Sequence, residues 1–323
     1  MNRQSRTAAA AALLLVGVLA LTGCASTDEG WSGGSPAGAP GAGTPTAGFP
    51  VTVHDDAGRS VTIAKKPLRI VSLAPANTEI VYALGLFSEL KGVTTYDDYP
   101  VEAAKLPKMG DFTTPNLEAI AKAKPDVILV TGGVQADVVG KLEASGAKVV
   151  VVDPQDLKGT YAAIATVGKV LGASERASRV VAKMKSDAAD IATMLASAPK
   201  VSCFVEIGWN PLFTAGKGTL LDDLITGAGG ANVVKQKGYV GYSAEQLVTD
   251  QPSVYLGTKS SIGDVGALAS RPGFSGLSAI KSGKVFSLDD DLVSRPGPRI
   301  VEGMREIAKA LHPGIVRDAV EPL

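Results

Sequence analysis

The chain has 323 residues, of which 45% are hydrophobic, and its 32 basic residues balance its 32 acidic residues. This length exceeds that of one ordinary domain and suits two lobes of ordinary size. A formal net charge of zero argues against nucleic acid as the main partner, because phosphate binding requires a basic surplus. After the N-terminal segment there is no run of about 18 uncharged apolar residues, so we expect no membrane-spanning helix in the folded part.

The N-terminal segment has the organisation of an export signal. Arg3 and Arg6 provide positive charge, and an apolar run follows over 8–21. The sequence Leu-Thr-Gly-Cys at 21–24 resembles the bacterial lipobox, in which the cysteine is lipid-modified and cleavage occurs just before it. We therefore predict a lipidated Cys24, with an ordinary secretory signal as the alternative.

The first two segments of the chain are accordingly predicted to be a signal peptide over 1–23 and a lipidated cysteine with a flexible tether over 24–50. The tether is rich in Gly, Ser, Pro, Ala and Thr, a composition that cannot bury a core. An anchor with more than one acyl chain gives stable attachment to a bilayer. We expect the protein at the extracytoplasmic face of the cell membrane.

The folded part contains few residues suited to catalysis or metal binding. Cys203 is the only cysteine after Cys24, and its apolar neighbours indicate inert packing in a buried strand. His54 and His312 lie at opposite ends of the folded region, which argues against a catalytic base and a His-rich metal site. Neither a Gly-x-Ser-x-Gly elbow nor a complete phosphate loop occurs. We expect a non-enzyme with no catalytic residue, resident metal or cofactor.

Strands alternate with helices after Pro50. Apolar runs at 51–53 and 60–63 flank a turn and predict a hairpin. A buried strand over 69–73 precedes a helix that we expect to begin with capping side chains near Asn77 and to end at Gly85. Continuous β-branched runs, which suit parallel strands covered on both faces, lie at 127–130 and 149–152.

An internal repeat indicates two lobes of the same plan. Glu118 precedes Pro125 by seven positions, and Glu245 precedes Pro252 by the same distance. A predicted strand starts just after each proline. A second pair of matches follows in the same order, Lys148 with Asp153 and Lys284 with Asp289, in each case five positions apart.

The segment 157–198 between the repeats has little β character. We expect a first helix that ends at Gly168 and Gly172, and a second from Ser174 to about Ser197. About 24 residues at 1.5 Å each give a rod near 36 Å long. The apolar positions that fall on one face of this rod are Val180, Val181, Met184, Ala188, Ile191 and Leu195.

The predicted fold class is therefore α/β. Two similar α/β lobes, over 51–156 and 199–323, are joined by a single long rigid helix within the linker 157–198. A ligand cleft between the lobes follows from this arrangement, because the rod holds the two lobes apart. One rigid helix also predicts limited closure of the cleft.

The chain from about Arg69 to Leu311 resembles the cobalamin- and siderophore-binding proteins of ABC importers, and within that family most of all the cobalamin binders. The segments that carry the resemblance are Ser72-Leu73-Ala74-Pro75-Ala76-Asn77-Thr78-Glu79, Thr95-Tyr96-Asp97-Asp98-Tyr99-Pro100, Asn116-Leu117-Glu118, Asn210-Pro211-Leu212-Phe213-Thr214 and Gly297-Pro298-Arg299-Ile300. The family implies ligand held between two lobes bridged by one long helix.

The resemblance also implies a set of ligand-binding residues. Aromatic rings bury much area at low entropic cost, and a charged pair can hydrogen-bond peripheral amides. Ordinary packing, or a surface ion pair for the last two residues, is the alternative. The residues carried over to the cleft are Pro75, Tyr96, Phe112, Phe213, Tyr239, Asp291 and Arg295.

Three positions depart from the cobalamin-binding pattern. Phe112, Thr131 and Tyr239 stand where the cobalamin binders that this chain most resembles carry tryptophans, and Thr131 has no ring at all. A smaller stacking surface should weaken cobalamin binding or shift the preference to another ligand.

Two glutamates are expected to dock the protein onto its transporter. Glu118 and Glu245 occupy equivalent places in the repeat, and in the family such glutamates contact arginines of the paired permease subunits. A two-fold permease requires a pseudo-two-fold contact on a monomer. The alternative is that each glutamate only favours the first turn of its helix.

The implied partners are an ABC permease dimer with its ATPase subunits, a small-molecule ligand and, through the anchor, the membrane. We expect a monomer that binds no nucleic acid. The first alternative ligand is a ferric siderophore or haem. A siderophore would favour additional cationic groups in the cleft, and Arg299 offers one. A zinc- or manganese-binding relative and an exported α/β enzyme are the remaining alternatives.

Overall fold

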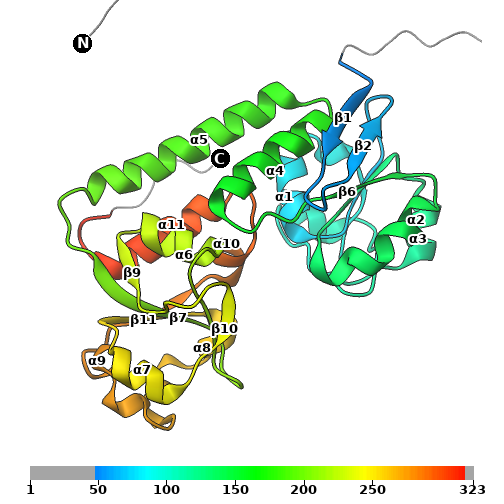
Figure 1. Cartoon of the computed structure of the whole chain (residues 1–323). Coiled ribbons are helices and arrows are strands. Elements are labelled where there is room, and N and C mark those ends of the chain that lie inside the picture. Colours follow the sequence, from blue (N-terminus) through cyan, green and yellow to red (C-terminus); the bar gives the residue numbers. More distant parts are fainter. Residues whose placement is uncertain (1–47, 317–323) are drawn as a thin grey trace, which may run out of the picture. The chain divides into compact units, whose positions relative to one another are not determined.

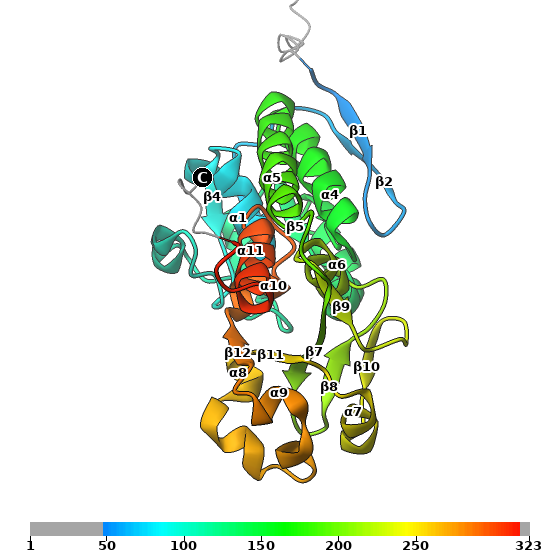
Figure 2. The same cartoon turned by 90° about the vertical axis from the view of Figure 1, so that its left-hand side faces the viewer.

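The computed structural model describes residues 48–316. The predicted signal peptide, Cys24 and the tether up to residue 47 lie outside the described residues. Within the described range the chain forms two α/β lobes connected through a pair of helices (Figures 1 and 2). No helix over 48–316 combines the length and the apolarity needed to cross a bilayer.

The first lobe contains a hairpin and a four-stranded parallel sheet. In the hairpin, β1 (Val51–His54) pairs antiparallel with β2 (Ser60–Ile63), as predicted. The sheet has the order β4-β3-β5-β6. All four residues of β5 are buried, because both faces of this strand are covered. The strands are β3 (Ile70–Ser72), β4 (Leu90–Gly92), β5 (Val127–Val130) and β6 (Lys148–Val151).

Three α-helices belong to this lobe: α1 (Pro75–Ala83), α2 (Leu117–Ala123) and α3 (Val139–Glu143). Helix α1 begins before the predicted Asn77, and no side chain caps it. Proline suits the first helical position, since its ring presets φ and the missing N–H is not needed there. Asn77 is buried inside the helix. Short 3-10 segments lie at Phe87–Glu89, Val101–Lys105 and Gly133–Val138.

Helices α4 (Leu157–Val170) and α5 (Ser174–Met194) form the connection between the lobes. The predicted helix end at Gly168 is wrong, because this glycine lies inside α4. A Cβ added at Gly168 would lie 2.4 Å from the Cβ of Ala177 in α5, so glycine is required for the close approach of the helices. Gly172 follows the end of α4 and has a φ of +65°, a left-handed conformation that commonly terminates a helix. With 21 residues, α5 is about 31 Å long, somewhat shorter than predicted.

The second lobe contains a six-stranded mixed sheet with the path β10-β8-β7-β11-β12, and β9 also pairs with β7. The strands are β7 (Val201–Gly208), β8 (Phe213–Ala215), β9 (Gly230–Asn232), β10 (Tyr239–Gly241), β11 (Val254–Thr258) and β12 (Val285–Leu288). Its helices are α6 (Leu220–Gly227), α7 (Ala244–Asp250), α8 (Lys259–Ile262), α9 (Ser278–Lys281), α10 (Asp290–Ser294) and α11 (Ile300–Leu311), with 3-10 segments at Val265–Ser270 and Phe274–Gly276.

The two lobes share a parallel core, which agrees with the internal repeat. The order β9-β7-β11-β12 in the second lobe corresponds to β4-β3-β5-β6 in the first, and all these neighbours are parallel. Lys124 and Gln251 end α2 and α7 in the left-handed conformation, with φ of 47° and 43°. Each stands directly before a proline, which disfavours a further right-handed helical residue.

A continuous apolar cluster runs through the junction of the lobes. It contains Ile70 of the first sheet, Ile164 and Ile191 of the two connecting helices, and Val205 of the second sheet. Separate clusters fill the outer side of each lobe. Cys203 packs within the junction cluster, fully buried as predicted, and this burial raises the pKa of its thiol to about 12.

Candidate ligand-binding cavity

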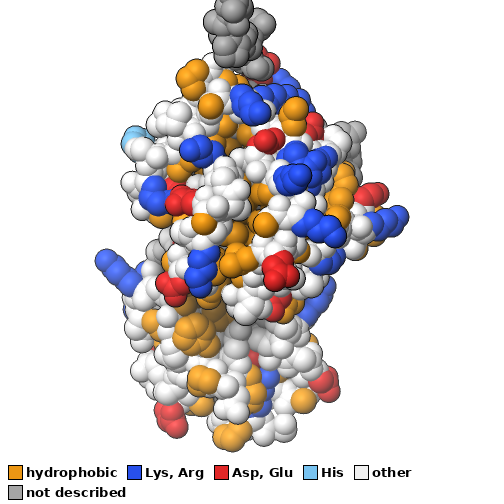
Figure 3. Space-filling view, turned by 90° about the vertical axis from the view of Figure 1, so that its right-hand side faces the viewer, with side chains coloured by type: hydrophobic (Ala, Val, Ile, Leu, Met, Phe, Trp, Pro, Cys, Tyr) orange, Lys and Arg blue, Asp and Glu red, His pale blue; other side chains and the backbone are white. Residues whose placement is uncertain are grey.

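A cavity of about 540 Å³ lies between the lobes. The surface is hollowed there, with hydrophobic side chains visible in the depth of the hollow (Figure 3). A volume of this size is typical of small-molecule sites. The residues that line it are Ala74, Pro75, Ala76, Asn77, Tyr96, Phe112, Thr113, Thr131, Val152, Asp153, Pro154, Gln155, Leu220, Tyr239, Ser294, Arg295 and Pro296.

Tyr96 lies in a loop that is held by hydrogen bonds to the buried carboxylate of Asp97. Asp97 is 2% exposed, and its Oδ2 accepts hydrogen bonds from the N–H of Thr94, at 2.9 Å, and from the Thr94 hydroxyl. The Thr94 hydroxyl oxygen accepts in turn from the N–H of Tyr96 at 3.2 Å. The ring of Tyr96 stays 60% exposed at the cavity, where it can stack against a flat ligand.

Phe112 is held by two polar side chains. The fully buried Gln135 donates from Nε2 to the carbonyl oxygens of Phe112, at 2.8 Å, and Leu73, at 2.7 Å. Asp111 accepts hydrogen bonds from the side chains and N–H groups of Thr114 and Thr113, which lower the pKa of its carboxyl to about 2. These contacts fix the short loop that carries the phenyl ring into the cavity wall.

The polar part of this wall is a small hydrogen-bonded group at the ends of β5 and β6. The hydroxyl of Thr131 donates to Oδ1 of Asp153 at 2.7 Å, and Nε2 of Gln155 donates to Oδ2 at 3.0 Å. Thr131 contributes no aromatic ring to the cavity. Its hydroxyl instead supports Asp153, the one carboxylate among the described residues that lines the cavity.

Tyr239 brings a third ring to the cavity from the second lobe. It begins β10 opposite Ala215 of β8 and is 48% exposed. Phe213 is not among the residues that line the cavity, and its contact with a ligand stays a prediction. Its partner in the ladder is Gly241, so Phe213 lies two residue pairs farther along the same face of the ribbon, at 38% exposure.

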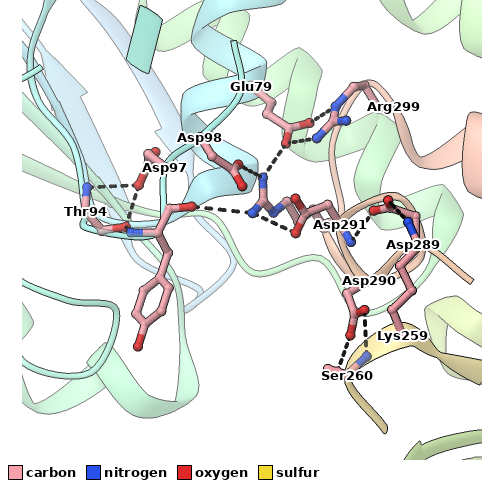
Figure 4. A network of polar contacts seen from close by, with 12 residues as sticks. Glu79, Thr94, Asp97, Asp98, Lys259, Ser260, Asp289, Asp290, Asp291 and Arg299 are labelled. Atoms are coloured by element: carbon pink, nitrogen blue, oxygen red, sulfur yellow. Dashed lines mark hydrogen bonds and ion pairs between the residues drawn. The ribbon is translucent and has the colours of Figure 1, made fainter. Parts of the chain in front are cut away.

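Arg295 lines the cavity, but its guanidinium is engaged within the protein (Figure 4). Nη1 donates to Glu79 at 3.1 Å and to Asp98 at 2.7 Å, and Nη2 donates to the carbonyl of Tyr96 at 3.4 Å. Nη2 also forms an ion pair with Asp291 at 2.7 Å. Asp291 is not among the residues that line the cavity, and this ion pair is the one that the alternative described; its contact with a ligand stays a prediction.

The buried carboxylate of Glu79 joins the lobes. Arg299 donates to it from Nε at 2.9 Å and from Nη2 at 2.6 Å, a bidentate geometry. The Arg299 guanidinium also lies 3.9 Å from the ring centre of Tyr99. Because Glu79 belongs to α1 and Arg299 directly precedes α11, these contacts cross from the first lobe to the second. Arg299 does not line the cavity.

The two predicted docking glutamates occupy matching positions. Glu118 stands in the first turn of α2, and Glu245 stands in the first turn of α7. Both are exposed, and neither forms an ion pair with any residue in the range 48–316. Their side chains are thus available to a partner, one from each lobe.

Sequence reasoning gave no site role to Glu79, Asp98, Asp153 or Gln135. Glu79 and Asp98 stand inside segments that carry the family resemblance, but the partner of Glu79 is 216 positions away. One signal was present. Arg295 and Arg299 are two cations four positions apart, just before and in the segment 297–300 that carries the family resemblance. Partly buried cations require carboxylate partners.

Comparison with known proteins identifies the family. Residues 70–292, which span both lobes and the connecting helices, match the model of the periplasmic binding protein family. This chain belongs to that family. The resemblance and the two-lobed α/β fold expected from the sequence are confirmed.

Its relatives in the family differ in what their names say they bind. The ABC transporter substrate-binding lipoprotein YvrC of Bacillus subtilis (strain 168) is 36% identical over 279 residues, which cover 84% of this chain and 88% of YvrC. The vitamin B12-binding protein of Salmonella paratyphi A is 29% identical over 246 residues, or 75% of this chain and 90% of that protein. A periplasmic heme-binding protein from Pseudomonas aeruginosa has a TM-score of 0.69 and 28% identity, and the match covers 77% of this chain and 94% of that structure.

Proposed function

We propose that this protein is the solute-binding protein of an ABC importer and that it captures cobalamin or a related corrinoid. Lipidated Cys24 holds it at the extracytoplasmic face of the membrane, and it delivers the ligand to a permease dimer with its ATPase subunits. The observation that carries the proposal is the cavity between the lobes, lined by Tyr96 and Phe112 from one lobe and Tyr239 from the other. The relatives named as substrate-binding and vitamin B12-binding proteins support it.

The composition of the cavity suits a broad, mostly apolar ligand with a polar rim. Three rings and several proline and alanine side chains provide contact area, and Asn77, Gln155 and Ser294 provide neutral hydrogen-bonding groups. Flat macrocycles stack well on such rings. Neutral side chains with both donors and acceptors match carboxamides at the edge of a corrin.

Haem is the second candidate ligand, favoured by the similarity to the periplasmic heme-binding protein from Pseudomonas aeruginosa. It offers an equally flat face but carries carboxylate side chains. The siderophore alternative rested on Arg299 as an extra cation, and Arg299 lies outside the cavity lining and binds Glu79. The specific support for an anionic siderophore is therefore lost.

Isothermal titration of the full chain in detergent with cyanocobalamin, haem and ferric siderophores tests the ligand. We expect saturable one-to-one binding of cyanocobalamin, and we expect Tyr96→Ala and Tyr239→Ala each to weaken it by about 10-fold, since truncation of an aromatic anchor costs more than 1 kcal/mol. Leu68→Ala serves as the control, because Leu68 is 61% exposed and outside the cavity lining. Binding of haem or a siderophore without any signal for cyanocobalamin would overturn the ligand assignment.

Docking is tested separately from ligand binding. We propose that Glu118 and Glu245 contact arginines of the two permease subunits, one from each lobe. Replacement of both by alanine should slow association with the permease and reduce uptake while ligand affinity is unchanged, since exposed charges act mainly on encounter and register. Unchanged association rates at low salt would remove these residues from the interface.

A further inference from the structure

Arg295, the single cation among the described residues that line the cavity, has almost no capacity left for a ligand. An arginine carries five N–H donors. Four of those of Arg295 have partners inside the protein, namely the Glu79 and Asp98 carboxylates on Nη1 and the Tyr96 carbonyl and Asp291 carboxylate on Nη2. Only the donor on Nε has no partner in these contacts. A ligand carboxylate therefore cannot form the two parallel hydrogen bonds that arginine normally offers.

The carboxylates around Arg295 outnumber the charges that they compensate. Arg295 and Arg299 together face Glu79, Asp98 and Asp291. Asp153 adds a further carboxylate directly in the cavity lining. Among the residues of the described chain that line the cavity, no lysine and no other arginine occurs. The polar end of the cavity thus carries a surplus of negative charge, from Asp153 in the lining and from the carboxylates that pair with Arg295 and Arg299.

The helix ends at the cavity provide little positive potential to offset this surplus. Helix α1 begins with Pro75, which has no N–H to offer, and carries no capping side chain. Helix α6 has Thr219 as its capping residue and two aspartates in its first turn. One of these, Asp223, also accepts from the N–H of Leu157 at the start of α4, at 3.0 Å. Acidic groups in these positions compensate the helix dipole.

We infer that Glu79, Asp98 and Asp291 form a charge-compensating set that cancels Arg295 at the cavity wall and makes the cavity select ligands with an uncharged or cationic periphery over ligands that carry carboxylates. This specificity rests on the proposed function, since it assigns a property to the same cavity. Asp98 and Asp291 are not among the lining residues, so they act on the ligand through Arg295, whose charge they cancel. A ligand carboxylate then finds no uncompensated cation at this wall and meets like charge. Asp98 and Asp291 are the accessible members, with side chains 62% and 36% exposed.

A pair of ligands that share one ring and differ only in charge tests the inference. Cobinamide carries carboxamides around the corrin, and cobyrinic acid carries carboxylates in their place. We expect the wild-type full chain to bind cobinamide at least about 100-fold more tightly, or about 2.8 kcal/mol. In the double variant Asp98→Asn with Asp291→Asn, this ratio should fall by at least about 10-fold, or 1.4 kcal/mol.

The matched control is Asp190→Asn, which removes one negative charge from an exposed position on α5 and should leave the ratio within about 3-fold of the wild type. Both ligands are measured on one preparation, so a partly unfolded variant changes both affinities and leaves their ratio unaffected. Equal affinity of the wild type for the two corrins would overturn the inference, as would a ratio that the double variant does not change.

Failure of the proposed corrinoid function is distinguishable from failure of the charge selection. If neither corrin binds, the same ratio is measured with haem and haem dimethyl ester, in which the carboxylates are esterified. Tighter binding of the ester retains the charge selection and discards the corrinoid. Tighter binding of the free acid discards the charge selection. Binding by neither pair removes both the proposed ligand class and the selection.

Discussion

At the scale of single residues, Glu79 makes charged contacts that connect the lobes directly. Its side chain is 2% exposed and accepts hydrogen bonds from both Arg295 and Arg299, whose side chains are 14% and 15% exposed. A buried carboxylate in this position is stable only while its partners remain. Loss of the carboxylate would leave two partly buried guanidinium groups without full compensation.

We predict that Glu79→Gln lowers the free energy of unfolding by about 3 kcal/mol, as expected when one partner of a buried ion-pair network is removed. The measurement is urea-induced unfolding of the full chain. Glu143→Gln is the control, since Glu143 pairs with Arg59 while 50% exposed, and its loss should cost less than about 1 kcal/mol. Equal effects of the two substitutions would show that Glu79 does not stabilise the junction.

Asp97 gives a prediction with a defined pH dependence. Burial raises the pKa of this carboxyl above its usual 3.8, and hydrogen bonds, including those from Thr94, offset only part of the effect. The folded state therefore binds the proton more tightly than the unfolded state. Stability gained from protonation appears as the pH falls through the raised folded pKa toward 3.8.

Asp97→Asn should accordingly be more stable than the wild type near neutral pH, because the variant does not bury a charge, and its advantage should shrink as the pH falls toward 4. The amide oxygen can still accept from the N–H of Thr94. Urea unfolding of both proteins between pH 4 and 7 checks the trend. A stability difference that is constant over this range would show that Asp97 does not titrate differently on folding.

Single residues were the hardest part to predict from sequence. Tyr96, Phe112, Tyr239 and Pro75 line the cavity as expected, because the family resemblance fixes them by position. Phe213 and Asp291 are not in the lining, and a single sequence does not show on which side of a cavity rim a side chain lies. Glu79 was missed because its partners lie in a distant part of the chain, and one sequence does not reveal which charges meet.

At the scale of elements, the pairing of α4 with α5 determines how stiffly the lobes are joined. The close approach at Gly168 and Ala177 allows the two helices to pack along each other (Figure 2). Sequence periodicity predicted the start of α5 at Ser174 and its buried positions Met184 and Ile191. It could not show that Gly168 is a packing position, because a glycine in a helix and a glycine at its end look alike without the partner.

We predict that Gly168→Ala lowers the free energy of unfolding by about 1–3 kcal/mol, because the added methyl group overpacks the helix interface. Gly140→Ala is the matched control. Gly140 also lies in a helix, α3, but an added Cβ there meets no atom within 4 Å, so the higher helix propensity of alanine should stabilise the protein by up to about 1 kcal/mol. Thermal or urea unfolding measures both. Stabilisation by Gly168→Ala would contradict the close contact.

Duplicated elements were more accessible to sequence analysis than unique ones. The repeat around Glu118 and Glu245 predicted equivalent helices, and α2 and α7 end at equivalent left-handed residues before prolines. The antiparallel ribbon of β8 and β10 has no counterpart in the described sheet of the first lobe. The internal repeat therefore could not predict this ribbon. This ribbon carries Tyr239, so the duplication could not predict the element that brings an aromatic ring from the second lobe into the cavity lining.

At the scale of the whole described unit, the lobes are held by three kinds of contact. The connecting helices span the junction, an apolar cluster runs through it, and the Glu79 network crosses it beside the cavity. Contacts of all three kinds would have to rearrange for a large change in the angle between the lobes. The molecule is therefore preorganised for its ligand.

We predict that ligand binding changes the radius of gyration of the full chain by less than about 1 Å, as in other preorganised complexes. Small-angle X-ray scattering with and without cyanocobalamin measures this change. A compaction of several ångströms would show that the lobes close on a flexible hinge and that the connecting helices do not set their spacing.

A crystal structure of the protein with saturating cyanocobalamin would test most directly the claim that the ligand is held between the lobes. We predict the corrin in the cavity, in contact with Tyr96 and Phe112 on one side and Tyr239 on the other. An empty cavity at saturation, or a corrin bound on another face of the molecule, would contradict it.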